Sequence, residues 1–271
     1  MKNADYKAAI FDIDGTLVPF SAVTASDATC RAVRALRRAG VTVIIATGRG
    51  PTRATPAVIG DVEHDYLVCV NGACTLGADG RLLFADTLSR EEMEDLLRFG
   101  KAHGASINFT FLDGYYAYCG RDALVQEYAE RCGEALEIID ATAHPRTDDA
   151  LPFGGFLMLP DDVAAAYNEM HTPLRLVRFI CGHHDICKRS TDKANSLARL
   201  LASIGMGWSD AVVFGDGLND VEMLAQAGLG VSFADASAQA QAVSGYIAPA
   251  SCDDGVARAL NALFDLAPYY D

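Results

Sequence analysis

The sequence has no run of apolar residues long enough to cross a membrane. No segment approaches the roughly 18 consecutive apolar residues that a membrane-spanning helix needs. The first residues, Met1 to Asp5, also lack the apolar stretch of a secretory signal. We therefore expect a soluble cytoplasmic protein with no membrane partner.

The chain is also poor in positive charge. It carries 22 Lys and Arg residues against 36 Asp and Glu, a formal net charge of −14, and no block of basic residues that could follow a phosphate backbone. This composition argues against nucleic acid as a partner. A small anionic substrate would need local positive charge or a metal ion to enter the negative field of the protein.

Cysteine is present but follows no metal-binding or disulfide pattern. The eight cysteines are scattered, and none forms a C-x-x-C pair. We interpret most of them as small buried side chains in a reducing compartment. With 271 residues, 51% hydrophobic and 21% charged, the chain is long enough for one large or two ordinary globular domains.

The clearest local pattern is a short apolar run that ends in two carboxylates. Residues 6–10 are typical of a buried strand, and Asp12-Ile13-Asp14-Gly15 follows almost directly. Because side chains alternate along a strand, Asp12 and Asp14 can share one side of the carboxyl edge, where open α/β sheets bind ligands. Two like charges so close need a cation or a shared proton. Taken alone, a hairpin turn explains the pair equally well.

Strand and helix patterns alternate in the first part of the chain, which predicts a doubly wound parallel sheet. The predicted elements after the first strand are a helix capped by Ser26 or Asp27 and ended by Gly40, a strand at 41–46, a helix beginning near Pro51 and a strand at 66–70.

Paired strands replace this alternation in the middle of the chain. They include a hairpin around Asp113-Gly114, and their order with the intervening helices predicts an antiparallel sheet with helices on one face. The parallel pattern then returns, with a helix capped by Thr191. We therefore predict an α/β, Rossmann-like core at residues 1–80 and 189–271, with an inserted α+β cap domain at 81–188.

Further polar residues stand at the ends of the core strands. They are Thr47 and Gly48, then Lys193, then Asp216, Asn219 and Asp220. Carboxylates without nearby His or Cys suit Mg²⁺, and a hydroxyl with amides at a helix start suits a phosphate oxygen. Each residue alone also fits a turn, a solvated lysine or a helix cap. Their occurrence in order at successive strand ends favours a phosphoryl-transfer site.

Three other polar groups are not placed in the predicted site. Arg49 and Asn71 also follow core strands, and we place them near the site rather than in it. The sequence His183-His184-Asp185 falls between two short predicted strands, so we interpret it as a turn rather than as a metal cluster.

Together, Phe11 to Leu17, Thr47-Gly48-Arg49, Lys193 and Gly215 to Asp220 resemble the four motifs of the haloacid dehalogenase superfamily of phosphatases. Asn71-Gly72-Ala73 and the insert between the second and third motifs resemble its Cof-type, or type IIB cap, subfamily. One position departs from the family pattern, because Ala194 stands where a Gly often follows the third-motif Lys.

The resemblance implies a role for each matching residue. Asp12 would attack phosphorus to form an aspartyl-phosphate, Asp14 would act as general acid and base, and Lys193 would neutralise charge. The residues implied to hold phosphate oxygens are Thr47, Gly48 and Asn219. The residues implied to hold Mg²⁺ are Asp12, Asp14 through its backbone carbonyl, Asp216 and Asp220, the last through water or by orienting Lys193.

The sequence thus predicts a Mg²⁺-dependent phosphatase for a small phosphorylated metabolite, such as a sugar phosphate or a cofactor phosphate. The presence of Asp14 argues against the haloalkanoate dehalogenases of the superfamily. Two alternatives stay open: a phosphomutase of the phosphomannomutase type, and a non-catalytic phosphate-sensing regulator. The inserted domain would close over the core and select the leaving group.

Overall fold

The computed structural model describes residues 5–132, 135–180 and 182–269, and these form two compact units. Unit 1 contains the described residues up to Arg49, then Arg53–Phe84 and those from Asp192 onward. Unit 2 contains Gly50–Thr52 and Ala85–Thr191. The sequence places the limits of the insert a few residues earlier, at 81 and 188.

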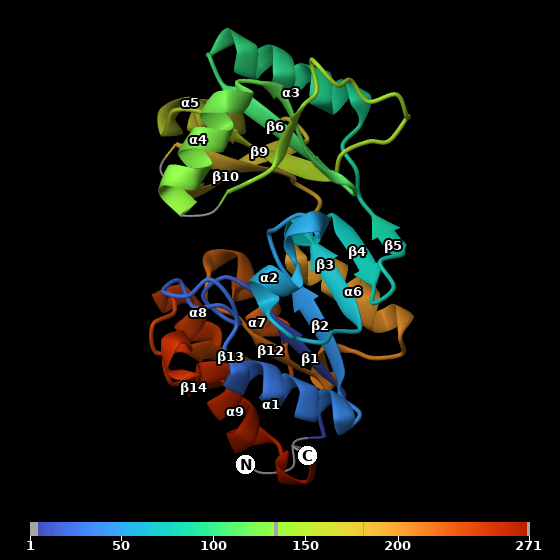
Figure 1. Ribbon diagram of the computed structural model, residues 1–271, viewed down its shortest axis with the longest axis vertical. Helices are drawn as coiled ribbons and strands as arrows, with labels where there is room; N and C mark the ends of the chain where they lie inside the picture. Colours follow the sequence, from blue (N-terminus) through green and yellow to red (C-terminus); the bar gives the residue numbers. More distant parts are fainter. Residues whose placement is uncertain (1–4, 133–134, 181, 270–271) are drawn as a thin grey trace. The chain divides into compact units, whose positions relative to one another are not determined.

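Unit 1 is built on an eight-stranded sheet of order β14-β13-β12-β1-β2-β3-β4-β5 (Figure 1). The pairings from β14 through β3 are parallel, whereas β4 runs antiparallel to β3. This confirms the predicted α/β class with a parallel core. The strands are β1 (Ala8–Phe11), β2 (Thr42–Ala46), β3 (Tyr66–Cys69), β4 (Cys74–Gly77), β5 (Leu82–Ala85), β12 (Ala211–Phe214), β13 (Leu229–Phe233) and β14 (Tyr246–Ala248).

Helices cover both faces of this sheet, as a doubly wound fold requires (Figure 1). Ala8 and Ile10 of β1 pack in one cluster with α6, α7 and α8, while α1 and α9 pack against each other on the other face. The helices are α1 (Asp27–Arg38), α2 (Pro56–Ile59), α6 (Lys193–Ser203), α7 (Val221–Gln226), α8 (Ala238–Val243) and α9 (Gly255–Leu263), with 3-10 turns at Val70–Gly72, Trp208–Asp210, Leu218–Asp220, Ser251–Asp253 and Ala267–Tyr269. Another 3-10 turn, Pro51–Arg53, has residues in both units.

Three helix starts refine the sequence prediction. Ser26, not Asp27, caps α1, because its side chain accepts a hydrogen bond from the Thr29 amide. Asp192, rather than Thr191, caps α6 by accepting from the Asn195 amide, and this makes Lys193 the first helical residue. The α-helix predicted near Pro51 is only a 3-10 turn there; α2 begins at Pro56.

Unit 2 has a six-stranded sheet of order β10-β11-β9-β6-β7-β8, antiparallel except for the β7–β8 pair. The sequence prediction missed β8, which has only three residues. The elements are α3 (Arg90–Ala102), β6 (Ser106–Phe111), β7 (Gly114–Cys119), α4 (Arg121–Cys132), β8 (Ile138–Asp140), β9 (Gly154–Met158), α5 (Asp161–Glu169), β10 (Leu174–Ile180) and β11 (His183–Lys188).

The helices of unit 2 lie on both faces of its sheet, so the prediction of one covered face is wrong. Leu157 of β9 packs in a cluster with α3 and α5, whereas its neighbour Phe156 packs with Leu124 of α4. Successive strand residues point to opposite faces, so α4 covers the face opposite α3 and α5.

The two histidines at the start of β11 also point to opposite faces. His183 lies 3.8 Å from Glu127 of α4, and His184 lies 3.2 Å from Asp161 of α5. They belong to a strand rather than to the predicted turn, and their alternation keeps them from converging on one metal ion.

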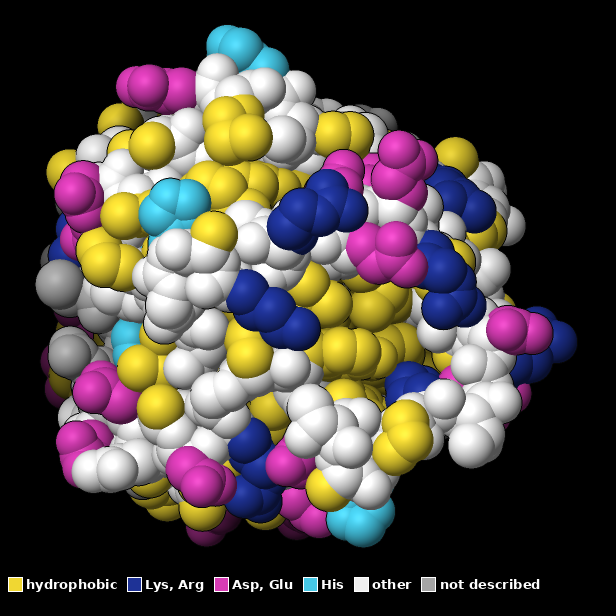
Figure 2. Space-filling model, turned by 90° about the horizontal axis from the view of Figure 1, so that it is seen from above, with side chains coloured by type: hydrophobic (Ala, Val, Ile, Leu, Met, Phe, Trp, Pro, Cys, Tyr) yellow, Lys and Arg dark blue, Asp and Glu magenta, His cyan; other side chains and the backbone are white. Residues whose placement is uncertain are grey.

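One face of the molecule mixes charges of both signs (Figure 2). On the face drawn in Figure 2, Lys and Arg side chains lie among Asp and Glu side chains, and hydrophobic side chains gather between them. In the part of the chain that the structure describes, no helix combines the length and apolarity of a membrane span.

Candidate active site

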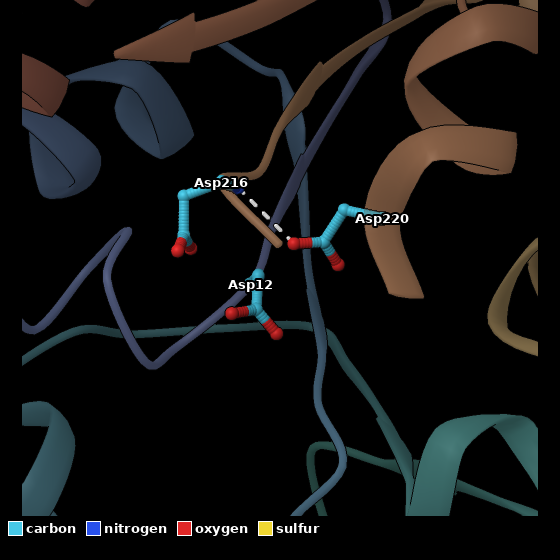
Figure 3. Close-up of side chains that lie close together, drawn as sticks. All are labelled: Asp12, Asp216 and Asp220. Atoms are coloured by element: carbon cyan, nitrogen blue, oxygen red, sulfur yellow. Dashed lines mark hydrogen bonds between the residues drawn. The ribbon is translucent and has the colours of Figure 1, made fainter. Parts of the chain in front are cut away.

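Three carboxylates from separate elements meet at the carboxyl edge of the unit 1 sheet. Asp12 follows β1, Asp216 follows β12 and Asp220 precedes α7. One oxygen from each lies within 4.8 Å of the other two, and all three residues are buried. Figure 3 shows the three side chains close together. The sheet edge thus assembles an acidic cluster from residues about 200 positions apart.

Lys193 is the cation of this cluster. Its Nζ lies 2.5 Å from Oδ1 of Asp12 and 2.8 Å from Oδ1 of Asp220, and the side chain is 1% exposed. Burial alone would lower the pKa of Lys193, but the charges of Asp12 and Asp220 outweigh it and raise that pKa. The ammonium group therefore stays charged at neutral pH.

One lysine does not neutralise three carboxylates. Burial raises the pKa of Asp12 well above its ordinary value, and the charges of Asp220 and Asp216 raise it further against the opposing effect of Lys193. Burial and then Asp220 raise the pKa of Asp216 to about 7. Both shifts come first from burial and then from the neighbouring carboxylates, and a divalent cation would offset both effects by favouring the ionised groups.

The donor set of the cluster fits Mg²⁺. It offers carboxylate oxygens only, and within residues 5–132, 135–180 and 182–269 it is the one group of three or more acidic, His or Cys residues close enough to share an ion. Gly15, with φ of 82°, permits this arrangement, because a Cβ there would lie 2.3 Å from Oδ2 of Asp216.

The neighbours of Asp216 and Asp220 fix their orientation. Thr16 donates its hydroxyl to Oδ1 of Asp216 at 3.0 Å, across 200 residues of sequence. Oδ2 of Asp220 accepts from the amides of Asp216, at 3.1 Å, and Gly217, at 2.9 Å. One oxygen of Asp220 thus accepts hydrogen bonds from the two amides of the turn, and the other accepts from Lys193. The sequence analysis assigned no role to Thr16, although it lies within the first motif.

Arg49 contacts a predicted site residue directly. Its Nε donates to Oδ2 of Asp14 at 2.9 Å and its Nη2 to Oδ1 at 2.7 Å, a two-pronged, charge-assisted contact. The Arg49 side chain is 14% exposed and that of Asp14 42%. The structure thus brings Arg49 into the site, where the sequence analysis had placed it only nearby. Asp14 itself contributes no carboxylate to the three-membered cluster.

The remaining predicted residues lie around the end of β2. Thr47 is fully buried, and its Oγ1 accepts from the Arg49 amide at 3.0 Å. Asn219 is exposed and donates from Nδ2 to Oδ1 of Asn71 at 3.3 Å. Gly48 lies against the same Asn71 side chain, since a Cβ on Gly48 would stand 3.1 Å from that oxygen. The structure therefore connects Gly48 and Asn219 through Asn71.

Comparison with known proteins gives consistent descriptions. The family described as haloacid dehalogenase-like hydrolase matches residues 9–260. A "Putative phosphatase" of Haemophilus influenzae is 28% identical over 246 residues, covering 86% of this chain and 87% of that protein. An "HMP-PP phosphatase" of Yersinia pseudotuberculosis is 27% identical over 248 residues, covering 86% of each.

Solved structures share the fold over nearly the whole length. A hypothetical protein from Geobacillus kaustophilus superposes with a TM-score of 0.83 at 26% identity, covering 95% of this chain and 98% of that one. The subclass IIB sugar phosphatase BT4131 superposes with a TM-score of 0.80 at 20% identity, covering 94% and 98%, a likeness of fold.

Proposed function

The chain belongs to the haloacid dehalogenase-like hydrolase family, and from that premise we propose that it is a Mg²⁺-dependent phosphatase acting through an aspartyl-phosphate. The match over residues 9–260 confirms the family resemblance and the prediction of an enzyme, and the relatives are named phosphatases. The observation that carries the proposal is Lys193 held between Asp12 and Asp220 in the acidic cluster.

In the first step, an oxygen of Asp12 forms a bond to phosphorus while the bond from phosphorus to the leaving oxygen breaks. Asp14 gives its proton to that leaving oxygen, which departs as a neutral alcohol. The positive charge of Lys193 stabilises the negative charge on the Asp12 carboxylate and on the phosphoryl group.

In the second step, Asp14 takes a proton from water, and the water oxygen bonds to phosphorus as the bond to Asp12 breaks. Inorganic phosphate leaves, and Asp12 returns as a carboxylate. The same side chain serves as acid and then as base, so its placement by Arg49 affects both steps.

The phosphoryl group needs donors for its oxygens. We assign this role to the Thr47 hydroxyl, the Gly48 amide and the Asn219 side chain. The hydroxyl of Thr47 accepts one hydrogen bond and keeps its own hydrogen to donate.

The acidic cluster would hold the metal ion. Asp12, Asp216 and the Asp14 backbone carbonyl are the proposed ligands, while Asp220, with both oxygens engaged, orients Lys193. When bound, Mg²⁺ supplies positive charge for the phosphoryl oxygens.

The substrate is a small phosphorylated metabolite. A relative named as an HMP-PP phosphatase, and a solved structure of the same fold titled a sugar phosphatase, support HMP-PP and sugar phosphates as the substrate classes to test. We assign the selection of the leaving group to unit 2, in the role of the cap predicted at residues 81–188. A cytoplasmic location agrees with the composition.

The experiment measures phosphate release from HMP-PP, sugar phosphates and pyridoxal phosphate, with and without Mg²⁺. The Asp12→Asn variant should abolish turnover, while Asp265→Asn, which changes an exposed acid of unit 1, should leave it intact. Release that needs neither Mg²⁺ nor Asp12 would overturn the mechanism. Phosphate transfer to a second sugar hydroxyl without release would favour the mutase, and a stable phosphoprotein would favour the regulator.

A further inference from the structure

The chain after β3 adopts a conformation that most side chains avoid. Val70 and Asn71 have φ of 50° and 51°, and Gly72 follows with φ of 105°. A β-branched residue such as Val is strained in this left-handed region, whereas Asn and Gly enter it more readily. Such strain persists only where the surrounding structure holds it, and it concentrates at functional sites.

One side of this turn is fastened to the end of β2. The Val70 amide donates to the Arg49 carbonyl at 3.0 Å, and the Asn71 amide donates to the Thr47 carbonyl at 3.1 Å. The turn is therefore bonded to the backbone of two residues that already belong to the proposed site.

The other side is fastened to the start of α6. Ser196 donates its hydroxyl to the Gly72 carbonyl at 2.5 Å. A Cβ on Gly72 would stand 2.3 Å from the Asp192 carbonyl oxygen, so only glycine permits this approach. Residues after β2 and at the start of α6 thus hold the strained turn in place.

The result is a defined position for the Asn71 carboxamide. It lies against Gly48, whose Cβ, if present, would stand 3.1 Å from Oδ1 and 3.3 Å from Nδ2. Its Oδ1 accepts from Nδ2 of Asn219 at 3.3 Å. The carboxamide therefore connects the second motif to the fourth, between two of the proposed phosphate-binding residues.

We propose that Asn71 is a positioning residue of the phosphate site, an inference that rests on the proposed function. Asn219 is exposed on a short turn, where its side chain would otherwise sample several rotamers. The hydrogen bond to Asn71 holds it in one orientation, so less conformational freedom is lost when the phosphoryl group binds. Contact with Asn71 also fixes the Gly48 turn.

The test uses Asn71→Gly, because glycine tolerates the positive φ and removes the side chain with its carboxamide. Binding of inorganic phosphate is measured by calorimetry with saturating Mg²⁺, beside KM and kcat for the best substrate. We expect the phosphate dissociation constant and KM to rise about tenfold, the effect of one lost hydrogen bond of about 1.4 kcal/mol. The thermal midpoint should not fall.

Two comparisons separate positioning from a general effect. Asn219→Ala should weaken phosphate binding to a similar degree, and the double variant should be no weaker than the weaker single variant. His171→Gly makes the same kind of change at another non-glycine residue with positive φ, 52°, in unit 2, and should leave phosphate binding unchanged.

Unchanged phosphate affinity in Asn71→Gly would overturn the inference. So would a double variant whose phosphate dissociation constant rises by the product of the two single-variant fold-changes. Phosphate binding without turnover would remove the proposed function while the binding test of Asn71 still stood. A native chain that binds no phosphate with Mg²⁺ present would overturn both.

Discussion

The buried carboxylate of Asp216 makes the stability of the metal-free protein depend on pH. Asp216 is 8% exposed, and burial, followed by the charge of Asp220, raises its pKa from 3.8 to about 7. The hydrogen bond from Thr16 and the charge of Lys193 oppose this rise. Without a divalent ion, the folded protein must therefore keep a proton on Asp216 or carry a buried charge.

The direction of this pH dependence follows from the difference in bound protons between the folded and unfolded states. Between about pH 4 and pH 7 the folded state binds more protons than the unfolded chain, so the free energy of unfolding falls as pH rises through this window. The contribution of Asp216 is fully present below about pH 4 and lost above about pH 7. A pKa difference from 3.8 to about 7 corresponds to about 4 kcal/mol at most.

The Asp216→Asn variant tests this directly, since its carboxamide oxygen can still accept from Thr16 but the group cannot ionise. In EDTA at pH 8 the variant should be more stable than the native chain by about 1–4 kcal/mol, and at pH 4 the two should be equal. Mg²⁺ should reverse the order at pH 8, because the native chain gains binding energy and the variant has lost a ligand.

The assay is urea unfolding followed by circular dichroism at pH 4 and pH 8, with EDTA or with Mg²⁺. Asp265→Asn, at an exposed position, serves as the control and should show no pH-dependent gain. Native stability that does not fall between pH 4 and pH 8 in EDTA would refute the reasoning, as would a variant that gains nothing at pH 8.

Three further predictions concern the surrounding side chains. Lys193→Met should lower the free energy of unfolding by about 3–5 kcal/mol in EDTA, because it leaves buried carboxylates uncompensated; urea unfolding measures it, and an unchanged midpoint contradicts it. Arg49→Gln should lower kcat/KM about tenfold for an alkyl phosphate and less for 4-nitrophenyl phosphate, whose leaving group needs no proton from Asp14; equal losses would assign Arg49 to another role. Thr16→Val should weaken Mg²⁺ binding about tenfold by releasing Asp216, seen by titrating thermal stability with Mg²⁺; unchanged affinity would refute this.

Local patterns were sufficient for the α/β class and for the residues at the strand ends. Strands such as β1 and β12 are continuous apolar runs, and each stops where polar residues begin. A parallel sheet brings such ends to one edge whatever the loops between them do. Asp12, Asp216 and Asp220 could therefore be assigned to one site from sequence.

Local patterns did not predict the short strand β8, the sheet face that each helix of unit 2 covers, or the N-cap of α6. β8 has three residues, too few to establish a period. The helix α4 lies on the face opposite α3 and α5, and packing against Phe156 rather than its own pattern decides this. The N-cap of α6 is Asp192 rather than the predicted Thr191. Both residue types are good N-caps, and only the backbone conformation selects one of them.

The sequence by itself determined which polar residues end the core strands and therefore which chemistry could gather there. Only the tertiary structure decided how those residues are held. The contacts of Arg49 with Asp14, Asn71 with Asn219 and Thr16 with Asp216 join residues 35, 148 and 200 positions apart. No local pattern encodes such pairs, because they depend on strand order and on the exact course of turns between strands, which packing of the whole sheet fixes.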